Sequence, residues 1–177
     1  MPQPERFDVL VLGSGTGGKL IAWHVARLGQ RTAVVERQWI GGSCPNIACM
    51  PSKNEIRSAE VAHLTRHAAQ FGTMTSSVVV DMATVRRRKR EMVERQVAKH
   101  LENYRASGAQ LIVGSGRFVA PKALEVSAHD AGTRTLTADK IFLNVGTHAG
   151  FPAFPAWQKP CRLLISRRSN SIICPRI

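Results

Sequence analysis

A glycine-rich turn near the N-terminus limits most strongly what this chain can fold into. The apolar run 7–12 ends in Gly-Ser-Gly-Thr-Gly-Gly, residues 13–18, and apolar side chains then recur at helical spacing until Gly29. A second β-rich run, 32–35, ends at Glu36. This order of strand, tight turn, helix, strand and acid predicts an α/β unit whose first two strands are parallel.

Each glycine of this turn has a physical task in a dinucleotide site. Gly13 permits the turn, Gly15 lets the backbone approach a pyrophosphate, and Gly18 lets the helix pack closely on the strand. The helix N-terminus offers N–H groups to the phosphate, and Glu36 can accept hydrogen bonds from an adenosine ribose. The hexapeptide alone fits an ordinary turn, but the full order of elements favours a dinucleotide site.

Two cysteines five residues apart are the second prominent feature. Cys44 and Cys49 lie between Gly41-Gly42 and the sequence Pro51-Ser52-Lys53. A thiol at the opening of a helix is stabilised as a thiolate by the helix dipole and by unpaired N–H groups. The residues alone are compatible with a redox-active pair or with two buried structural thiols. A zinc site is disfavoured, because no Cys or His pair follows at finger spacing.

This stretch resembles the signature of the flavin-dependent pyridine nucleotide-disulfide oxidoreductases, the family of dihydrolipoamide dehydrogenase, glutathione reductase and mercuric reductase. The family signature reads Gly-Gly-Thr-Cys-x-Asn-x-Gly-Cys-x-Pro-Ser-Lys. The chain departs from it with Ser43 for Thr and Ala48 for Gly. A left-handed residue 48 would make alanine costly, whereas a helical one would accept it. The resemblance covers roughly residues 5–155, and its matching positions are Gly41, Gly42, Cys44, Asn46, Cys49, Pro51, Ser52 and Lys53.

The resemblance implies an FAD-dependent oxidoreductase. A redox-active Cys44–Cys49 disulfide would pass electrons from NAD(P)H to a disulfide or soft-metal substrate. Cys49 would face the flavin as the charge-transfer thiol, and Cys44 would attack the substrate. FAD would bind the N-terminal glycines, because the cysteine motif follows them directly. Lys53 would lie near the flavin, although a solvated surface lysine is the alternative. The implied cofactor-binding residues are Gly13, Gly15, Gly18, Glu36, Ser43, Lys53, Gly146 and Thr147, and no metal ligand is predicted.

The remaining chain predicts two helices and several short strands. Asp81 is expected to cap a long helix that ends at Gly108. The preceding helix should present an apolar stripe of Val61, Leu64 and Ala68, and the long helix should carry Val93, Val97, Leu101 and Tyr104 on one face. The runs 111–113, 117–120, 124–126 and 134–137 indicate a small antiparallel meander, and 141–145 indicates a buried strand that leads to Gly146.

The predicted fold class is therefore α/β: a Rossmann-like FAD-binding domain with a parallel sheet, helices and a meander. It is expected to be incomplete, because neither a second glycine fingerprint nor the family's C-terminal interface domain is found. Residues 1–155 would be the N-terminal part of the FAD/NAD(P)-binding domain, and residues 156–177 an aberrant, disordered tail. The chain alone is then expected to be inactive, and the family's homodimer is doubtful for it.

The net charge and the number of cysteines help to choose between the alternative functions. The formal net charge of +13 favours a polyanion as a partner, but the tail holds five basic residues and no acid. The basic run 86–90 is expected to be a solvated helix face rather than a phosphate contact. We therefore favour a small-molecule or metal-ion substrate over nucleic acid, and a flavin-binding fragment without turnover is the other alternative. Four cysteines, with Cys161 and Cys174 in the tail, form no secreted disulfide framework, so a cytoplasmic protein without a membrane span is expected.

The chain contains six histidines. None matches the motif of the family's substrate-side base, and each is expected to be a surface histidine or one with satisfied hydrogen bonds. They are His24, His63, His67, His100, His129 and His148.

Overall fold

The structure is a computed structural model that describes residues 3–129 and 132–147. The chain divides into two units, Met1–Gly146 and Thr147–Ile177, and the fold below is that of the first. The predicted tail, 156–177, lies outside the described residues, together with its two cysteines. In chain order the elements are β1 (Glu5–Leu12), α1 (Thr16–Arg27), β2 (Thr32–Glu36), α2 (Ser43–Asn46), α3 (Cys49–Arg66), the 3₁₀ helix η1 (Ala68–Phe71), α4 (Met82–Ser107), β3 (Gln110–Ala120), β4 (Ala123–Ala128) and β5 (Gly132–Leu143).

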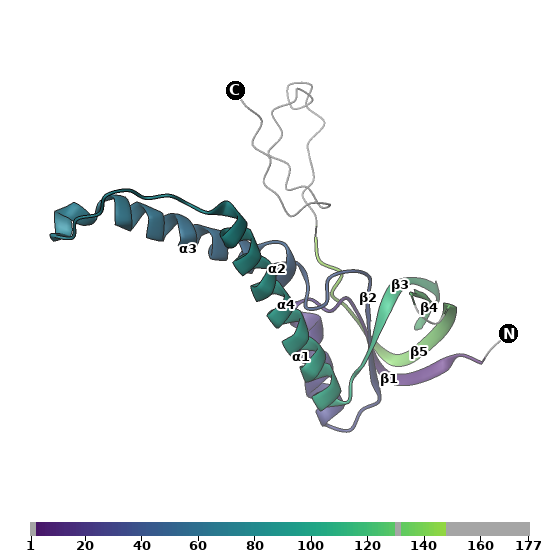
Figure 1. Cartoon of the computed structure of the whole chain (residues 1–177). Helices are drawn as coiled ribbons and strands as arrows, with labels where there is room; N and C mark the ends of the chain where they lie inside the picture. The colour runs from purple at the N-terminus through teal and green to yellow at the C-terminus, as the bar shows by residue number, and fades with distance from the viewer. Residues whose placement is uncertain (1–2, 130–131, 148–177) are drawn as a thin grey trace, which may run out of the picture. The chain divides into compact units, whose positions relative to one another are not determined.

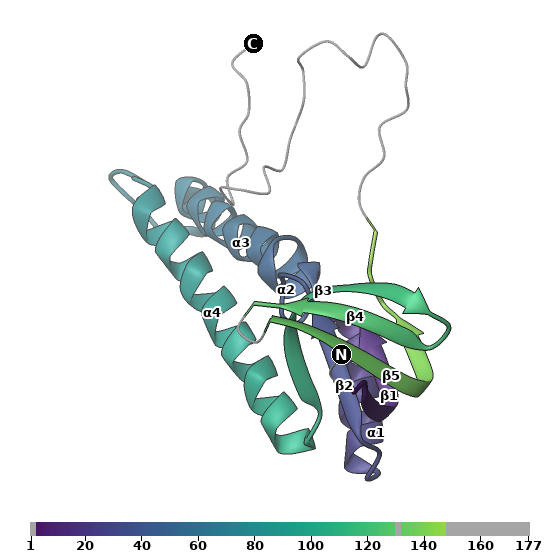
Figure 2. The same cartoon turned by 90° about the vertical axis from the view of Figure 1, so that its right-hand side faces the viewer.

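The five strands form one closed barrel. β1 pairs in parallel with both β2 and β5, and β2 pairs in parallel with β3. β4 pairs antiparallel with β3 and with β5, and this closes the barrel (Figure 2). The mixed α/β class was therefore predicted correctly. β1 occupies the centre of the parallel part, with Val9 opposite Thr32 on one side and Lys140 on the other.

Two strands are longer than the sequence indicated. We expected separate strands at 111–113 and 117–120, but β3 runs through both, because Gly114 and Gly116 are strand residues and not a turn. A Cβ on Gly114 would collide with the carbonyl oxygen of Ser127 on β4, so the glycine permits close strand pairing. β5 likewise runs through 134–137 and on to Leu143, so it includes most of the run predicted at 141–145. The prediction that this run is buried was wrong, because Phe142, Leu143 and Val145 are exposed. Each long strand belongs to the parallel part at one end and to the antiparallel part at the other.

The inner parallel strands, β1 and β2, have buried side chains on both faces, as parallel strands usually do. Leu10 and Val35 point into the barrel, where they pack with Leu136 and other side chains of the antiparallel strands. Val9 and Val11 point to the opposite face and pack with Trp23 of α1 and Tyr104 of α4. The two cores therefore meet across β1 and β2, which end beside the cysteine motif.

Helix α4 begins and ends where the sequence predicted. The Asp81 side chain accepts hydrogen bonds from the N–H groups of Ala83 and Thr84, at 2.9 and 3.2 Å, and the helix ends at Gly108, whose φ is +78°. The predicted apolar face was correct for Tyr104 but otherwise wrong by about one position. The fully buried residues are Lys89, Met92, His100, Tyr104 and Ser107, while Val93, Val97 and Leu101 are half-buried. The spacing of apolar residues does not reveal this buried face, because two of its members, Lys89 and His100, are basic.

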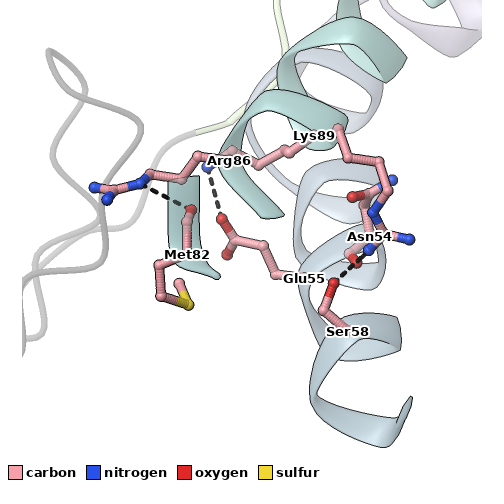
Figure 3. A network of polar contacts seen from close by, with 7 residues as sticks. Asn54, Glu55, Ser58, Met82, Arg86 and Lys89 are labelled. Atoms are coloured by element: carbon pink, nitrogen blue, oxygen red, sulfur yellow. Dashed lines mark hydrogen bonds and ion pairs between the residues drawn. The ribbon is translucent and has the colours of Figure 1, made fainter. Parts of the chain in front are cut away.

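Helix α3 and the N-terminal part of α4 run side by side and away from the barrel (Figures 1 and 2). Polar contacts join them, as Figure 3 shows. Lys89 Nζ lies 2.7 Å from Glu55 Oε1, and Arg88 Nη2 donates to the Asn54 carbonyl oxygen at 2.6 Å and to Ser58 Oγ at 2.5 Å. The four arginines of the basic run are exposed, as expected for a solvated face, but Lys89 is buried.

The apolar stripe predicted on α3 does not form a buried face among the described residues. Val61 and Leu64 are 50% and 52% exposed, whereas Pro51 and Ala62 are the residues of this helix that are buried. The helix contacts α4, α2 and η1, and Ile56, Val61 and Leu64 are its most exposed apolar side chains.

Candidate functional site

The glycine turn lies where the ends of three strands meet. Gly13, with φ of +100°, follows β1, and its N–H donates to the Val35 carbonyl oxygen at 2.8 Å. A Cβ on Gly13 would collide with the carbonyl oxygen of Asn144, and one on Gly18 would collide with that of Gly13. The packing tasks expected of these two glycines are therefore present. The approach of Gly15 to a pyrophosphate stays a prediction.

Asn144 is a residue of this turn that the sequence analysis passed over. It follows β5, and its backbone N–H donates to the Leu12 carbonyl oxygen at 2.8 Å. With its amide oxygen turned toward α1, the side chain accepts hydrogen bonds from the N–H groups of Gly15 and Gly18, each at 3.2 Å. Asn144 thus satisfies two of the N–H groups that a helix N-terminus leaves without an intrahelical partner.

Two further N–H groups at this helix end have no protein partner. The structure gives the backbone N–H groups of Thr16 and Gly17 no hydrogen bond within residues 3–129 and 132–147. The first intrahelical bond joins the Lys19 N–H to the Gly15 carbonyl oxygen at 2.9 Å, and the first turn carries no acid. This end of α1 can therefore bind an anion.

Glu36 is buried at the end of β2, and the chain itself fills its acceptor positions. Oε1 accepts the N–H groups of Gln38 and Trp39 at 2.9 and 3.0 Å, and Oε2 accepts the N–H and the hydroxyl of Ser14 at 2.8 and 2.7 Å. Burial raises the pKa of Glu36, but these hydrogen bonds outweigh burial, so its pKa lies below its ordinary value. A ribose hydroxyl would have to replace one of these donors, and the Ser14 hydroxyl is the donor that can rotate away.

Ser14 also connects the glycine turn to the cysteine motif. Its Oγ, fully buried, accepts a hydrogen bond from the N–H of Gly41 at 2.9 Å. Gly42, with φ of +86°, passes so close to the turn that a Cβ on it would lie 2.7 Å from the Gly15 Cα. Asn46 fixes this crossing, because its Nδ2 donates to the carbonyl oxygens of Ile40 and Gly42 at 2.9 and 2.7 Å. The two predicted motifs are therefore in direct contact.

The two cysteines are neighbours across the junction of α2 and α3. Cys44 lies in α2 and is half-buried, and Cys49 is the first residue of α3 and is exposed. Both are free thiols in this structure, so the predicted disulfide stays a prediction. Ala48 between them has φ of −121°, so it is not left-handed, and the cost that a left-handed alanine would carry does not arise here.

The charges around Cys44 have opposing effects on its acidity. Its hydrogen bond with Cys49 raises the pKa of Cys44, and burial adds to this increase. The positive charges of Lys19 and Lys53 favour the thiolate but offset this increase only in part, so the pKa of Cys44 lies above its ordinary value. Lys53, exposed and one turn after Cys49, therefore acts electrostatically on the dithiol as well as being solvated.

Lys19 and His100 form a buried polar pair that the sequence analysis missed. Lys19 is 9% exposed, and its Nζ lies 3.0 Å from His100 Nε2 and 3.4 Å from the carbonyl oxygen of Gly41. The expectation of a surface or satisfied histidine was wrong for His100, which is buried and whose Nδ1 has no partner among the described residues. The spacing of apolar residues could not indicate this pair, because both members are basic and their burial is seen only in the structure.

For three of the predicted site residues, no hydrogen bond to the glycine turn is found within residues 3–129 and 132–147. Ser43 is exposed at the start of α2. Gly146 is exposed with φ of +71°, and a Cβ on it would meet nothing within 4 Å. Thr147 belongs to the second unit. Their cofactor-binding roles stay predictions.

The described residues contain no group of three or more His, Cys, Asp or Glu side chains that could hold a metal ion. None of their helices combines the length and the apolar character that a membrane crossing requires.

Comparisons with known proteins identify the family. The pattern of the family described as pyridine nucleotide-disulphide oxidoreductase matches residues 7–169. Dihydrolipoyl dehydrogenase of Bacillus subtilis is 39% identical over 116 residues, which are 66% of this chain and 24% of the relative. That of Chlorobaculum parvum is 36% identical over 170 residues, which are 95% of this chain and 35% of the relative.

Solved structures agree with this result. The HOCl-induced flavoprotein disulfide reductase RclA of Escherichia coli, solved as a Cu(II) complex, matches with a TM-score of 0.71 and 25% identity, over 89% of this chain and 32% of that one. The chain thus spans about a third or less of the length of these relatives. Its mixed α/β fold agrees with the Rossmann-like FAD-binding domain of the family. The chain belongs to the pyridine nucleotide-disulphide oxidoreductase family.

Proposed function

We propose that this chain is the FAD-binding part of an FAD-dependent oxidoreductase in which Cys44 and Cys49 form the redox-active pair. The observation that carries the proposal is the contact between the two motifs. Gly42 packs on Gly15, and Ser14 hydrogen-bonds both Glu36 and Gly41. A dinucleotide bound at the glycine turn would therefore lie beside the dithiol.

The residues at the turn fit FAD. The N–H groups of Thr16 and Gly17 are available to a pyrophosphate at the positive end of α1. Glu36 keeps its carboxylate ionised and can exchange the Ser14 hydroxyl for a ribose hydroxyl. FAD would supply the two-electron redox chemistry. The chain would hold it through these groups, and Gly15, Gly18, Ser43, Lys53, Gly146 and Thr147 are the further residues proposed to contact it.

The dithiol would act as the electron carrier of the protein itself. Two electrons and two protons added to a Cys44–Cys49 disulfide break the S–S bond and give the two thiols present in the structure. The thiolate of Cys44 could then attack a substrate disulfide or bind a soft metal ion, while Cys49 faces the flavin. We propose NAD(P)H as the electron donor. The relatives named dihydrolipoyl dehydrogenase and disulfide reductase support a disulfide-type substrate.

The other expectations are proposals of the same kind. Strands β3 to β5 would be the antiparallel meander of an FAD domain that occupies residues 1–155. The match with the family ends at residue 169, inside the segment predicted as an aberrant tail, and that prediction stands untested. A cytoplasmic location, and a homodimer in the longer relatives, are proposed from the resemblance alone. No observation in the structure favours the nucleic-acid alternative.

A titration with FAD tests this proposal. The purified chain should take up one FAD, followed by the visible absorbance and the quenching of flavin fluorescence. Glu36→Gln should weaken binding roughly tenfold or more, because a hydrogen bond to a charged group contributes about 1.5–3 kcal/mol. Glu60→Gln is the matched control, because Glu60 is an exposed residue of α3 paired with Arg57. Folded wild-type chain that takes up no FAD would refute the proposal.

A further inference from the structure

The interface between α1 and α4 contains a buried lysine, Lys19, that has no carboxylate partner among the described residues. Lys19 lies in the first turn of α1, and its ammonium contacts only uncharged acceptors, His100 Nε2 and the Gly41 carbonyl oxygen. A buried charge is costly unless an opposite charge compensates it. The position of Lys19 therefore requires an explanation that packing alone does not give.

His100 orients this lysine but does not neutralise it. Its ring packs on Trp23, with centroids 5.9 Å apart, and lies so close to Gly41 that a Cβ there would collide with it. Because Nε2 accepts from Lys19, the ring hydrogen is on Nδ1. Burial and then the charge of Lys19 lower the pKa of His100, so the imidazole is neutral. Glycine at position 41 is what allows the ring and the ammonium to reach the cysteine motif.

The acidic group that acts on Lys19 is the thiol of Cys44, which becomes an anion when it loses its proton. Cys44 follows Gly41 by three residues, and the titratable groups that act on it are Cys49 and Lys53 from α3 and Lys19 from α1. The interaction is mutual, because burial lowers the pKa of Lys19 whereas Cys44 raises it. Lys53 is exposed, so water screens its charge, but Lys19 acts from a buried position where screening is weaker.

We propose that Lys19 is a positioning residue for the redox pair: its ammonium, fixed by His100 and the Gly41 carbonyl, stabilises the thiolate of Cys44 and directs nucleophilic attack to that sulfur. The use of this thiolate rests on the proposed function, but the effect of the charge on the thiol does not. It can be measured on the chain without FAD.

The test is the pH profile of alkylation at Cys44. The full chain carrying Cys49→Ala is reduced and treated with iodoacetamide, which forms an S–C bond and releases iodide. Peptide mass spectrometry then follows Cys44 separately from Cys161 and Cys174. Lys19→Met, which removes the charge and keeps the length, should raise the apparent pKa of Cys44 by about one unit and lower its alkylation rate at neutral pH roughly tenfold.

Three controls give each outcome a meaning. Lys19→Arg should keep the wild-type profile, and so should Lys99→Met, which removes an exposed lysine of α4 paired with Glu102. His100→Leu should shift the profile in the same direction as Lys19→Met, because it releases the ammonium, and it decides the matter if Lys19→Met does not fold. A folded Lys19→Met or His100→Leu chain with the wild-type profile overturns the inference. Failure to bind FAD would refute the proposed function and leave this thiol measurement unaffected.

Discussion

Replacing Asn144 with alanine should destabilise the fold through the start of α1. The side-chain oxygen accepts two backbone N–H groups, from Gly15 and Gly18, and alanine leaves both without a partner. A net hydrogen bond contributes about 1 kcal/mol, and a lost helix cap costs about 0.5–2 kcal/mol. We therefore expect the free energy of unfolding to fall by about 2 kcal/mol. Since Asn144 is half-buried, water can compensate only in part.

Urea unfolding of the chain without FAD is the assay. With a slope of about 1–3 kcal/mol per M, a loss of about 2 kcal/mol lowers the midpoint by roughly 1 M. Asn144→Asp is the matched control, because a carboxylate accepts the same N–H groups and is favoured at a helix N-terminus. This variant should keep its stability but bind FAD more weakly, because its charge repels a pyrophosphate. An alanine variant within about 0.5 kcal/mol of wild type, a typical surface effect, would refute the reasoning.

Three further predictions concern the same site. The pKa of Glu36 is lowered, so its contribution to stability is present above the unfolded carboxyl pKa of about 4.3 and is lost as the pH falls through the folded pKa. The free energy of unfolding of Glu36→Gln, measured against pH, should therefore lack this decline at acid pH. An unchanged decline would contradict the prediction. On oxidation, peptide mapping under non-reducing conditions should find Cys44 bridged to Cys49, and a bridge from Cys44 to Cys161 or Cys174 would overturn the assignment. The 177-residue chain by itself should show no steady-state oxidation of NADH or NADPH with a disulfide or mercuric substrate, and sustained turnover would show that less of the family's length is needed than we expect.

The features that local chemistry determines were predictable from the sequence. The glycine turn, the position of Glu36 and both ends of α4 follow from residues within a few positions of one another. An aspartate followed by a helical run and a glycine indicates a capped helix whatever surrounds it. The contact of the two motifs could also be anticipated, because the family signature follows the second strand directly.

The features that depend on distant segments were not predictable in the same way. Gly114 and Gly116 indicate a turn locally, but pairing with β4 makes them strand residues. The buried face of α4 contains Lys89 and His100 because Glu55 and Lys19 pair with them from other helices. Asn144 contributes to the glycine turn only because β5 pairs with β1. A periodic pattern carries no information about such partners.

The pairing of β1 with β5 also determines when the glycine turn can be completed during synthesis. Val9 pairs with Lys140, 131 positions later in the chain, and Asn144 follows immediately. The first strand and the glycine turn therefore leave the ribosome long before the strand and side chain that complete them. Such non-local closure is slow and leaves apolar strand edges exposed in the meantime. Early capture of FAD by the nascent chain is thus not expected, and β5 is the element on which productive folding of the N-terminal motif depends.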